Sequence, residues 1–334
     1  MNILVTAEKG YKRDIYFPDE IINILNKLGN VKFNKKDKPY TSQELKNEIK
    51  DIDICITHWG CPKFTKEIVD NANKLKLIAH AAGSVAYFIT DYVYDNQIIV
   101  CSANSIMAKY VAEANLAYIL SALRLIPQHN YDMKYNKGWN RKTSKIDTLF
   151  DKKVGLIGLG TIGRYLIELT KPFSLEFLVY DPYISKSDIS KYPNVKLASM
   201  NDVLTSGDII SIQASLTPET YHMVDSKKLK LLKDNTLFIN TSRGPIVEEK
   251  ALIKELESGR IFAVLDVFED EPLDEASKLR DLENVILIPH MGGAPAREDM
   301  TYGIIDEIKR YINNKPLKYE IPRKQFKLMT REIK

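Results

Sequence analysis

Residues 153–163 read KVGLIGLGTIG, an apolar run that leads into three glycines at the spacing G-x-G-x-x-G. The glycines are Gly158, Gly160 and Gly163. A glycine triplet alone is a weak signal, but a triplet that ends a strand and opens a helix is typical of a dinucleotide-binding turn. The first glycine permits the turn, the second admits a pyrophosphate, and the third lets helix and strand pack closely. We therefore predict a dinucleotide site that includes Thr161 and Ile162.

The acidic residue that such a site requires follows at the expected distance. The next apolar run, EFLVYD, ends at Asp181, 18 residues after Gly163 (181 − 163). A carboxylate about 20 residues after the triplet accepts hydrogen bonds from the ribose hydroxyls and would repel a 2′-phosphate. A glycine-rich turn with a helix-capping Asp is the alternative, but it does not account for the strand, triplet, helix and acid in this order. The pattern predicts NAD as the cofactor.

The same alternation of apolar runs and amphipathic stretches extends along the chain. The expected strands are 2–6, 52–57, 75–79, 98–101, 153–157, 176–180, 209–213, 237–240, 261–265 and 285–288. The expected helices are 19–28, 42–49, 65–73, 105–126, 162–170 and 296–313. Continuous apolar strands alternating with helices predict doubly wound parallel sheets, that is, the α/β class. A chain of 334 residues is long for one core and suggests two domains.

The domain boundaries follow from one unusual helical pattern. Residues 105–126 are apolar over most of the helix circumference and stop at Pro127. Because such a helix is buried, often between domains, we place a boundary just before it and a second one after VILIPH, at residue 290. This gives a discontinuous, flavodoxin-like substrate-binding domain (1–103 and 291–334). Residues 104–290 form a Rossmann-type NAD-binding domain, and we expect an interdomain cleft.

Composition excludes several other classes of protein. The net charge of +4 is spread along the chain without a basic block, so we expect no nucleic-acid partner. The three cysteines form no CxxC pair, which argues against a disulfide framework. We see no signal-peptide pattern and no apolar stretch of about 18 residues, and therefore expect a cytoplasmic protein without membrane contact.

Four sequence blocks carry a resemblance to a known family. In order they are GLIGLGTIG, SLTPETYHMV with Thr217 and Thr220, FINTSRGPIVEEKALIKELESGRIFAVLDVFEDEP, and PHMGGA. Together they resemble the D-isomer-specific 2-hydroxyacid dehydrogenases, most strongly over residues 151–293. The resemblance implies an oxidoreductase that moves hydride between NAD(H) and a small D-2-hydroxy acid/2-keto acid pair. It also implies a homodimer, which we expect to form through residues 105–126.

The resemblance also implies a catalytic set: Arg243 in TSRG, Glu271 in DVFEDEP and His290 in PHMGG. These residue types suit the reaction. A histidine exchanges protons near neutral pH, and a neighbouring carboxylate favours its charged form. A guanidinium grips a substrate carboxylate with paired donors. Taken singly, the three have ordinary structural explanations: a surface ion pair, a solvated acidic loop and a core histidine.

Further contacts are expected from the same resemblance. On the cofactor side they are Thr217, Thr241, Ser242 and Asp266. On the substrate side, backbone N–H groups of Gly83 and Ser84 join Arg243 in binding the carboxylate. The family pattern of glycine followed by an acidic residue is altered here, since LIAHAAGSVAYFITD continues with Val85 and Ala86. The identity of the acid therefore stays open among glyoxylate, hydroxypyruvate, phosphoglycerate and branched or aromatic keto acids.

Two rival functions differ in class. The first is an NAD-sensing regulatory protein on the same fold, which would bind NADH without turnover. The second is a metal-dependent enzyme, because His58, His80 and His290 each end an apolar run and imidazole suits zinc. No short-spacing ligand motif supports the second, so we predict an enzyme without a metal and expect His58 or His80 to shape the pocket or cap a strand.

Overall fold

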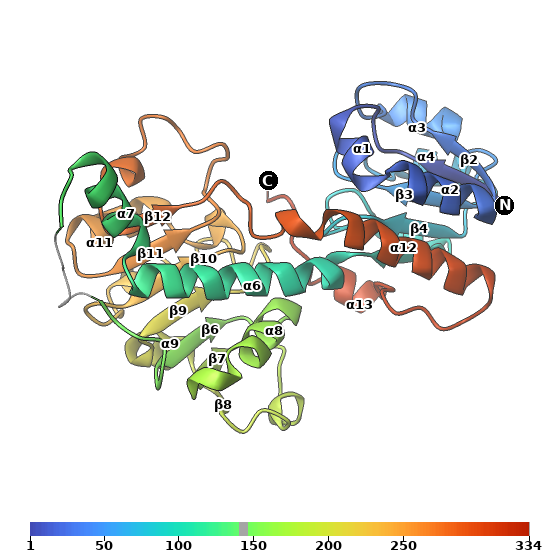
Figure 1. The fold of residues 1–334 in the computed structure, drawn as a ribbon. Helices are drawn as coiled ribbons and strands as arrows, with labels where there is room; N and C mark the ends of the chain where they lie inside the picture. The colour runs from blue at the N-terminus through green and yellow to red at the C-terminus, as the bar shows by residue number, and fades with distance from the viewer. Residues whose placement is uncertain (140–145, 334) are drawn as a thin grey trace. The chain divides into compact units, whose positions relative to one another are not determined.

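The computed structural model describes residues 1–139 and 146–333 and divides the chain into two compact units (Figure 1). Unit 1 contains Met1–Met107 and Ala294–Glu332, so the blue and red ends of the chain in Figure 1 belong to one unit. Unit 2 contains Ala108–Gly293, and Ile333 packs with it. Each unit is built on one parallel sheet, which confirms the predicted fold class of two doubly wound α/β domains.

The sheet of unit 1 has the order β2-β1-β3-β4-β5, which is the flavodoxin-like arrangement. Its strands are β1 (Asn2–Val5), β2 (Asn30–Phe33), β3 (Ile54–Thr57), β4 (Leu77–His80) and β5 (Ile99–Ser102). Its helices are α1 (Tyr11–Tyr16), α2 (Asp19–Leu28), α3 (Ser42–Glu48), α4 (Lys66–Asn71), α5 (Asp91–Asp95), α12 (Arg297–Ile312) and α13 (Arg323–Phe326). The C-terminal helix α12 packs against α1 and α2, so the end of the chain completes this unit.

The sheet of unit 2 has the order β12-β11-β10-β9-β6-β7-β8. Its strands are β6 (Lys153–Ile157), β7 (Glu176–Tyr180), β8 (Val195–Leu197), β9 (Ile209–Ile212), β10 (Leu237–Asn240), β11 (Phe262–Leu265) and β12 (Val285–Leu287). Its helices are α6 (Asn104–Leu123, which begins in unit 1), α7 (Ile126–Tyr135), α8 (Thr161–Leu169), α9 (Met200–Ser206), α10 (Ser226–Leu229) and α11 (Glu249–Glu257). The strand order reverses between β6 and β9, and ligands of such sheets bind outside the carboxyl ends of the strands at this point.

All ten predicted strands are present, and the two that were not predicted, β2 and β8, are edge strands. Strand β2 has no buried residue, and β8 is only three residues long. Neither of these two strands has the continuous apolar run that marks a buried parallel strand.

One local expectation was wrong. Helix α6 ends at Leu123, and Pro127 lies in the first turn of the next helix, where its missing N–H costs no hydrogen bond. The segment after Pro316 packs into unit 1, since Phe326 and Met329 are buried in its core. In the part of the chain that the structure describes, no helix has the length and apolar character needed to cross a membrane.

Candidate active site

The glycine turn is tight at its first glycine and open at its second. Gly158 has a φ of +95°, and a Cβ added there would lie 2.7 Å from the backbone nitrogen of Ala214. Gly160 has no atom within 4 Å of an added Cβ, so this side of the turn is open. At Gly163 an added Cβ would meet its neighbours at 3.4 Å or more, which is ordinary packing. The prediction of a close approach at this third glycine was therefore wrong.

Asp181 lies directly beside the turn. Its carboxylate accepts one hydrogen bond from the backbone N–H of Leu159 (2.8 Å) and another from that of Tyr183 (2.9 Å). Helix α8 starts at Thr161 without a side-chain cap, which leaves N–H groups of its first turn available to an anion. The open space at Gly160, the N-terminus of α8 and the carboxylate of Asp181 together fit a dinucleotide.

The segment after β10 presents the next group of predicted residues. Ser242 donates through its backbone N–H to Oδ1 of Asn240 (3.1 Å), and Asn240 donates from Nδ2 to the carbonyl of Arg243 (3.0 Å). The Ser242 hydroxyl donates to the carbonyl of Ala214, which follows β9. These bonds close the chain into a tight turn, so Thr241, Ser242 and Arg243 stand at the carboxyl end of the sheet.

A buried amide network lies beneath this turn, and the sequence analysis did not find it. Asn115 on α6 is fully buried, and its Nδ2 donates to the carbonyl of Val111 (2.9 Å) and to the hydroxyl of Thr241 (2.8 Å). Its Oδ1 accepts from Ser211 (3.3 Å) and from Gln213 (3.2 Å). A buried amide is costly unless its donors and acceptor are used, as they are here. The available signal was an Asn in the middle of a mostly apolar helical pattern.

Asp266, just after β11, fixes the segment that follows His290. Its two carboxylate oxygens accept from the backbone N–H groups of Met291 (2.7 Å) and Gly292 (2.8 Å). Burial raises the pKa of Asp266, although these two hydrogen bonds act in the opposite direction. A partly desolvated carboxyl at a strand end is typical of functional sites, but here it also has an anchoring task.

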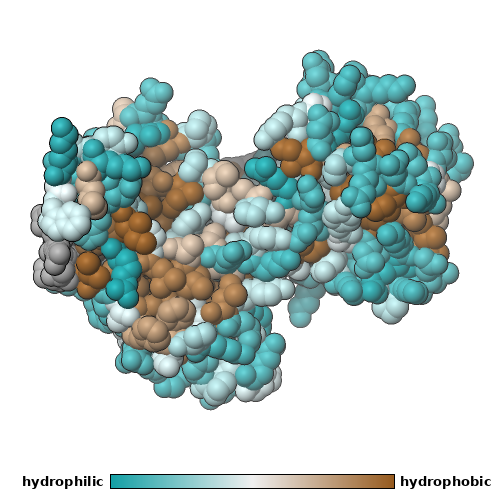
Figure 2. All heavy atoms as spheres, in the orientation of Figure 1, coloured by the Kyte–Doolittle hydropathy of each residue, from teal (hydrophilic) through white to brown (hydrophobic). Residues whose placement is uncertain are grey.

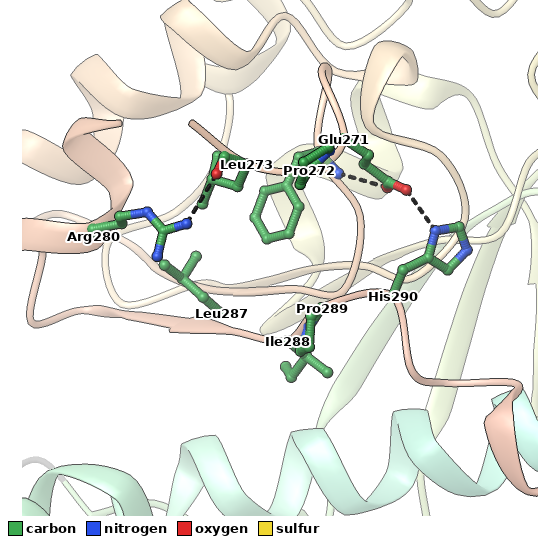
Figure 3. Close-up of a pocket in the computed structure, with 9 residues that line it drawn as sticks. Glu271, Pro272, Leu273, Arg280, Leu287, Ile288, Pro289 and His290 are labelled. Carbon is green, nitrogen blue, oxygen red and sulfur yellow. Dashed lines mark hydrogen bonds and ion pairs between the residues drawn. The ribbon is translucent and has the colours of Figure 1, made fainter. Parts of the chain in front are cut away.

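Glu271 and His290 form a hydrogen-bonded pair, as Figure 3 shows. Nδ1 of His290 lies 2.7 Å from Oε2 of Glu271, and the backbone N–H of Phe268 donates to Oε1 (3.2 Å). Burial alone would raise the pKa of Glu271, but the hydrogen bond and charge of His290 lower it overall. Nδ1 is engaged by the carboxylate, so Nε2 remains for a substrate. The side chains are 47% and 36% exposed.

Arg243 belongs to the same constellation. It precedes the short 3-10 turn Gly244–Ile246, is partly buried, and donates from Nη1 to the carbonyl of Ser242 (2.6 Å). Its charge also contributes to the lowered pKa of Glu271. Gly244 packs directly on the backbone of Phe268 and Glu269, the loop that carries Glu271. The structure thus places the three predicted catalytic residues in unit 2, with Glu271 bonded to His290 and Arg243 near enough for its charge to act on Glu271.

A pocket of about 570 Å³ lies on one side of the His–Glu pair. It is lined by Phe268, Glu271, Pro272, Leu273, Arg280, Leu287, Ile288, Pro289 and His290. Arg280 lies at the opposite end from His290, and its guanidinium donates to the carbonyl of Leu273 (2.9 Å; Figure 3) and to that of Asp274 (2.9 Å). The wall beside Glu271 is therefore mostly apolar, and water is partly excluded from the carboxylate.

The predicted substrate-side residues Gly83 and Ser84 lie in unit 1. The Ser84 hydroxyl donates to the carbonyl of Thr330 (2.6 Å), and the carbonyl of Gly83 accepts from Ser102 (2.5 Å). In unit 2 the backbone N–H of Thr217 donates to the Thr220 hydroxyl (2.8 Å). Thr217 therefore belongs to a self-contained turn after β9.

The remaining histidines of the metal hypothesis also lie in unit 1. His80 is buried, and its Nδ1 pairs with the Thr57 hydroxyl at 2.9 Å. Burial, with a smaller contribution from His58, lowers the pKa of His80 to about 3, so it stays neutral. Across residues 1–139 and 146–333, no group of three His, Cys, Asp or Glu side chains is placed to hold a metal ion.

Known proteins resemble this chain in sequence. Residues 116–292 match the family model described as D-isomer specific 2-hydroxyacid dehydrogenase, NAD binding domain. D-3-phosphoglycerate dehydrogenase of Methanocaldococcus jannaschii is 34% identical over 298 residues, which are 88% of this chain and 56% of that enzyme. Hydroxypyruvate reductase of Thermotoga maritima is 30% identical over 279 residues, 81% of this chain and 89% of the relative.

A solved structure shares the fold at lower identity. A glyoxylate reductase from Paecilomyes thermophila is 21% identical and superposes with a TM-score of 0.80, covering 97% of this chain and 98% of the other. The chain belongs to the D-isomer specific 2-hydroxyacid dehydrogenase family. It is an NAD-dependent oxidoreductase that transfers hydride between NAD(H) and a hydroxy acid/keto acid pair. The names of these relatives give no support to the regulatory alternative.

Proposed function

We propose that the chain interconverts a small D-2-hydroxy acid and its 2-keto acid, with His290 as the acid/base, Glu271 as its partner and Arg243 as the clamp for the substrate. The observation that carries this proposal is the 2.7 Å hydrogen bond between Nδ1 of His290 and the carboxylate of Glu271. An imidazole held by a carboxylate on one nitrogen exchanges protons through the other.

His290 balances the charge of the reaction. When hydride reaches the carbonyl carbon of a keto acid, the carbonyl oxygen gains an electron pair, and protonated His290 donates its Nε2 proton there. Oxidation of the hydroxy acid reverses both transfers. Glu271 stays ionised because its pKa is lowered, and its negative charge favours the imidazolium that must donate.

Arg243 binds and polarises the substrate. Its planar guanidinium offers paired N–H donors to the substrate carboxylate and a positive charge to the neighbouring carbonyl oxygen. The tight turn around Asn240 and Ser242 holds the backbone of Arg243, so the side chain starts from a fixed position. Gly83 and Ser84 are proposed as further donors to the carboxylate.

The cofactor is held by residues at the carboxyl ends of the strands of unit 2. Gly158, Gly160, Thr161, Ile162 and Gly163 would take the pyrophosphate, and Asp181 would take the ribose hydroxyls. We assign Thr217, Thr241, Ser242 and Asp266 to the nicotinamide side. When bound, NADH supplies the hydride.

The substrate class is tested by a panel of keto acids. The relatives are named for 3-phosphoglycerate and hydroxypyruvate, and the structural neighbour for glyoxylate, so these acids come first. Oxidation of NADH is followed by its absorbance with each acid, and NADPH serves as the matched control. We expect turnover of at least one small keto acid and a strong preference for NADH. Binding of NADH without turnover of any acid would refute the proposal.

A homodimer and a cytoplasmic location complete the proposal. The dimer is supported by the apolar composition of α6, around which apolar side chains reach the surface of unit 2 in Figure 2. Sedimentation at several protein concentrations tests it, and a monomer at all of them would refute it.

A further inference from the structure

The loop that carries Glu271 is held by a second histidine–carboxylate pair. Nε2 of His222 lies 2.5 Å from Oε1 of Glu269, two residues before Glu271. The two side chains are only 30% and 27% exposed. The proposed reaction uses neither residue, although both lie close to the residues it does use.

His222 is fixed in place by the segment that follows Arg243. Its backbone has a φ of +49°, in the left-handed region, and its N–H donates to the carbonyl of Pro245 (2.8 Å). Two residues later Val224 forms a parallel bridge with Val247. The imidazole also stacks on the ring of Tyr221 at 4.0 Å with an interplanar angle of 17°. The ring is thus set by backbone and packing before it meets Glu269.

Glu269 connects this anchor to the catalytic loop. Its backbone N–H donates to Oε2 of Glu249 on α11 (3.0 Å), while its carboxylate meets His222. Burial raises the pKa of Glu249, and the nearby carboxylates of Glu269 and Asp270 raise it further. The outer side of the loop therefore gathers three acidic groups, and like charges at short range repel one another.

We propose that His222 is a positioning residue for hydride transfer: through Glu269 it holds the 266–272 loop so that Glu271 reaches His290. Glu269 and Glu271 are two residues apart and bond to different histidines, so the loop is fixed on two sides. Without His222, Glu269 would face Glu249 and Asp270 without a partner, and the loop would move away from them. This inference rests on the proposed function of Glu271 and His290.

The burial of the pair distinguishes it from an ordinary surface ion pair. The nearby pair of Lys278 and Glu257 has side chains that are 70% and 40% exposed. Exposed pairs of that kind contribute little to stability, because water screens them and long side chains lose entropy. The pair of His222 and Glu269 is more shielded, and one partner has a fixed ring. The pair is therefore suited to holding the 266–272 loop in one position.

The test compares His222→Ala with His222→Gln, whose amide N–H can still donate to Glu269, and with Lys278→Ala as a matched control. For His222→Ala we expect kcat to fall about tenfold, as a small misplacement of a catalytic group does. The KM for the keto acid and the affinity for NADH should stay within about twofold, since binding groups are untouched. His222→Gln should recover most of kcat, and Lys278→Ala should match the wild type.

Two further readouts separate positioning from mere stability. In His222→Ala the pH at which keto-acid reduction declines should move downward, because the imidazolium of His290 loses support from a displaced Glu271. The ¹⁵N NMR signals of the His290 ring should change as well, and this readout needs no turnover. Unchanged kcat, pH profile and ring signals, with only a lower melting temperature, would overturn the inference. A wild type that reduces no keto acid would instead refute the proposed function.

Discussion

Gly244 offers a sharp test of how the site is assembled, because any side chain there collides with the loop of Glu271. A Cβ added to Gly244 would lie 1.8 Å from the carbonyl oxygen of Phe268 and 2.4 Å from the backbone nitrogen of Glu269. Real Cβ atoms stay beyond 3.0 Å. In Gly244→Ala the two segments must therefore separate by about 1.2 Å (3.0 − 1.8), which close-packed interiors do not absorb locally.

This displacement is large enough to break the catalytic pair. Phe268 donates its N–H to Glu271, so a shift of Phe268 carries Glu271 with it. The distance between Glu271 and His290 would grow from 2.7 Å to about 3.9 Å, beyond hydrogen-bond reach. A misplacement of about 1 Å costs on the order of 100-fold in rate, which corresponds to about 2.7 kcal/mol in the barrier.

The assay compares kcat of Gly244→Ala with that of Gly259→Ala. Gly259, unlike Gly244, has a positive φ (+71°), and no atom lies within 4 Å of a Cβ added to it, so its variant is strained without a collision. We expect Gly259→Ala to lose about 1 kcal/mol of stability and to keep its kcat. Gly244→Ala should lose about 100-fold in kcat while still binding NADH. Full activity in Gly244→Ala would refute the reasoning, as would an equal loss in both variants.

Three further predictions concern single residues. The carboxyl of Glu271 has a folded-state pKa below its ordinary 4.5, so its ionised form stabilises the fold above pH 4.5 and this stabilisation is lost as pH falls through the lowered pKa. Urea unfolding of Glu271→Gln should show a constant deficit above that pH and none below the lowered pKa; a deficit at every pH would contradict this. Arg243→Lys loses the paired donors, so kcat/KM for the keto acid, measured in steady state, should fall by about tenfold or more. An unchanged kcat/KM would show that Arg243 does not bind the substrate carboxylate through paired donors. Asn115→Ala leaves Thr241, Ser211 and Gln213 without their buried partner, and thermal unfolding should reveal a loss of about 2–3 kcal/mol; a loss near zero would mean that the network relaxes.

The fold could be predicted from the sequence because most of its strands are buried and read as continuous apolar runs. Runs such as 153–157, 176–180 and 237–240 became β6, β7 and β10 with the expected bounds. A central parallel strand is covered on both faces, so its residues are apolar on both sides and the strand is recognisable in the sequence. Strands β2 and β8 lack such an apolar run, and they were missed for this reason.

The proposed catalytic set was also named from the sequence, through the family resemblance of the blocks that contain Arg243, Glu271 and His290. The features that hold them were not. The contact of Gly244 with Phe268, and the pair of His222 with Glu269, join segments that only the fold brings together. Neither the glycine in TSRG nor the histidine in TYHMV has a local sequence feature from which these partners could be predicted.

If the imidazole of His290 supplies the proton, its replacement by an amide that cannot carry one, in His290→Asn, must slow the reaction. Asparagine can still hydrogen-bond Glu271 but cannot carry a proton to the substrate oxygen. In a single turnover with enzyme-bound NADH and the preferred keto acid, we predict unchanged NADH binding and a hydride-transfer rate reduced by about 1,000-fold. A rate equal to that of the wild type would contradict the account.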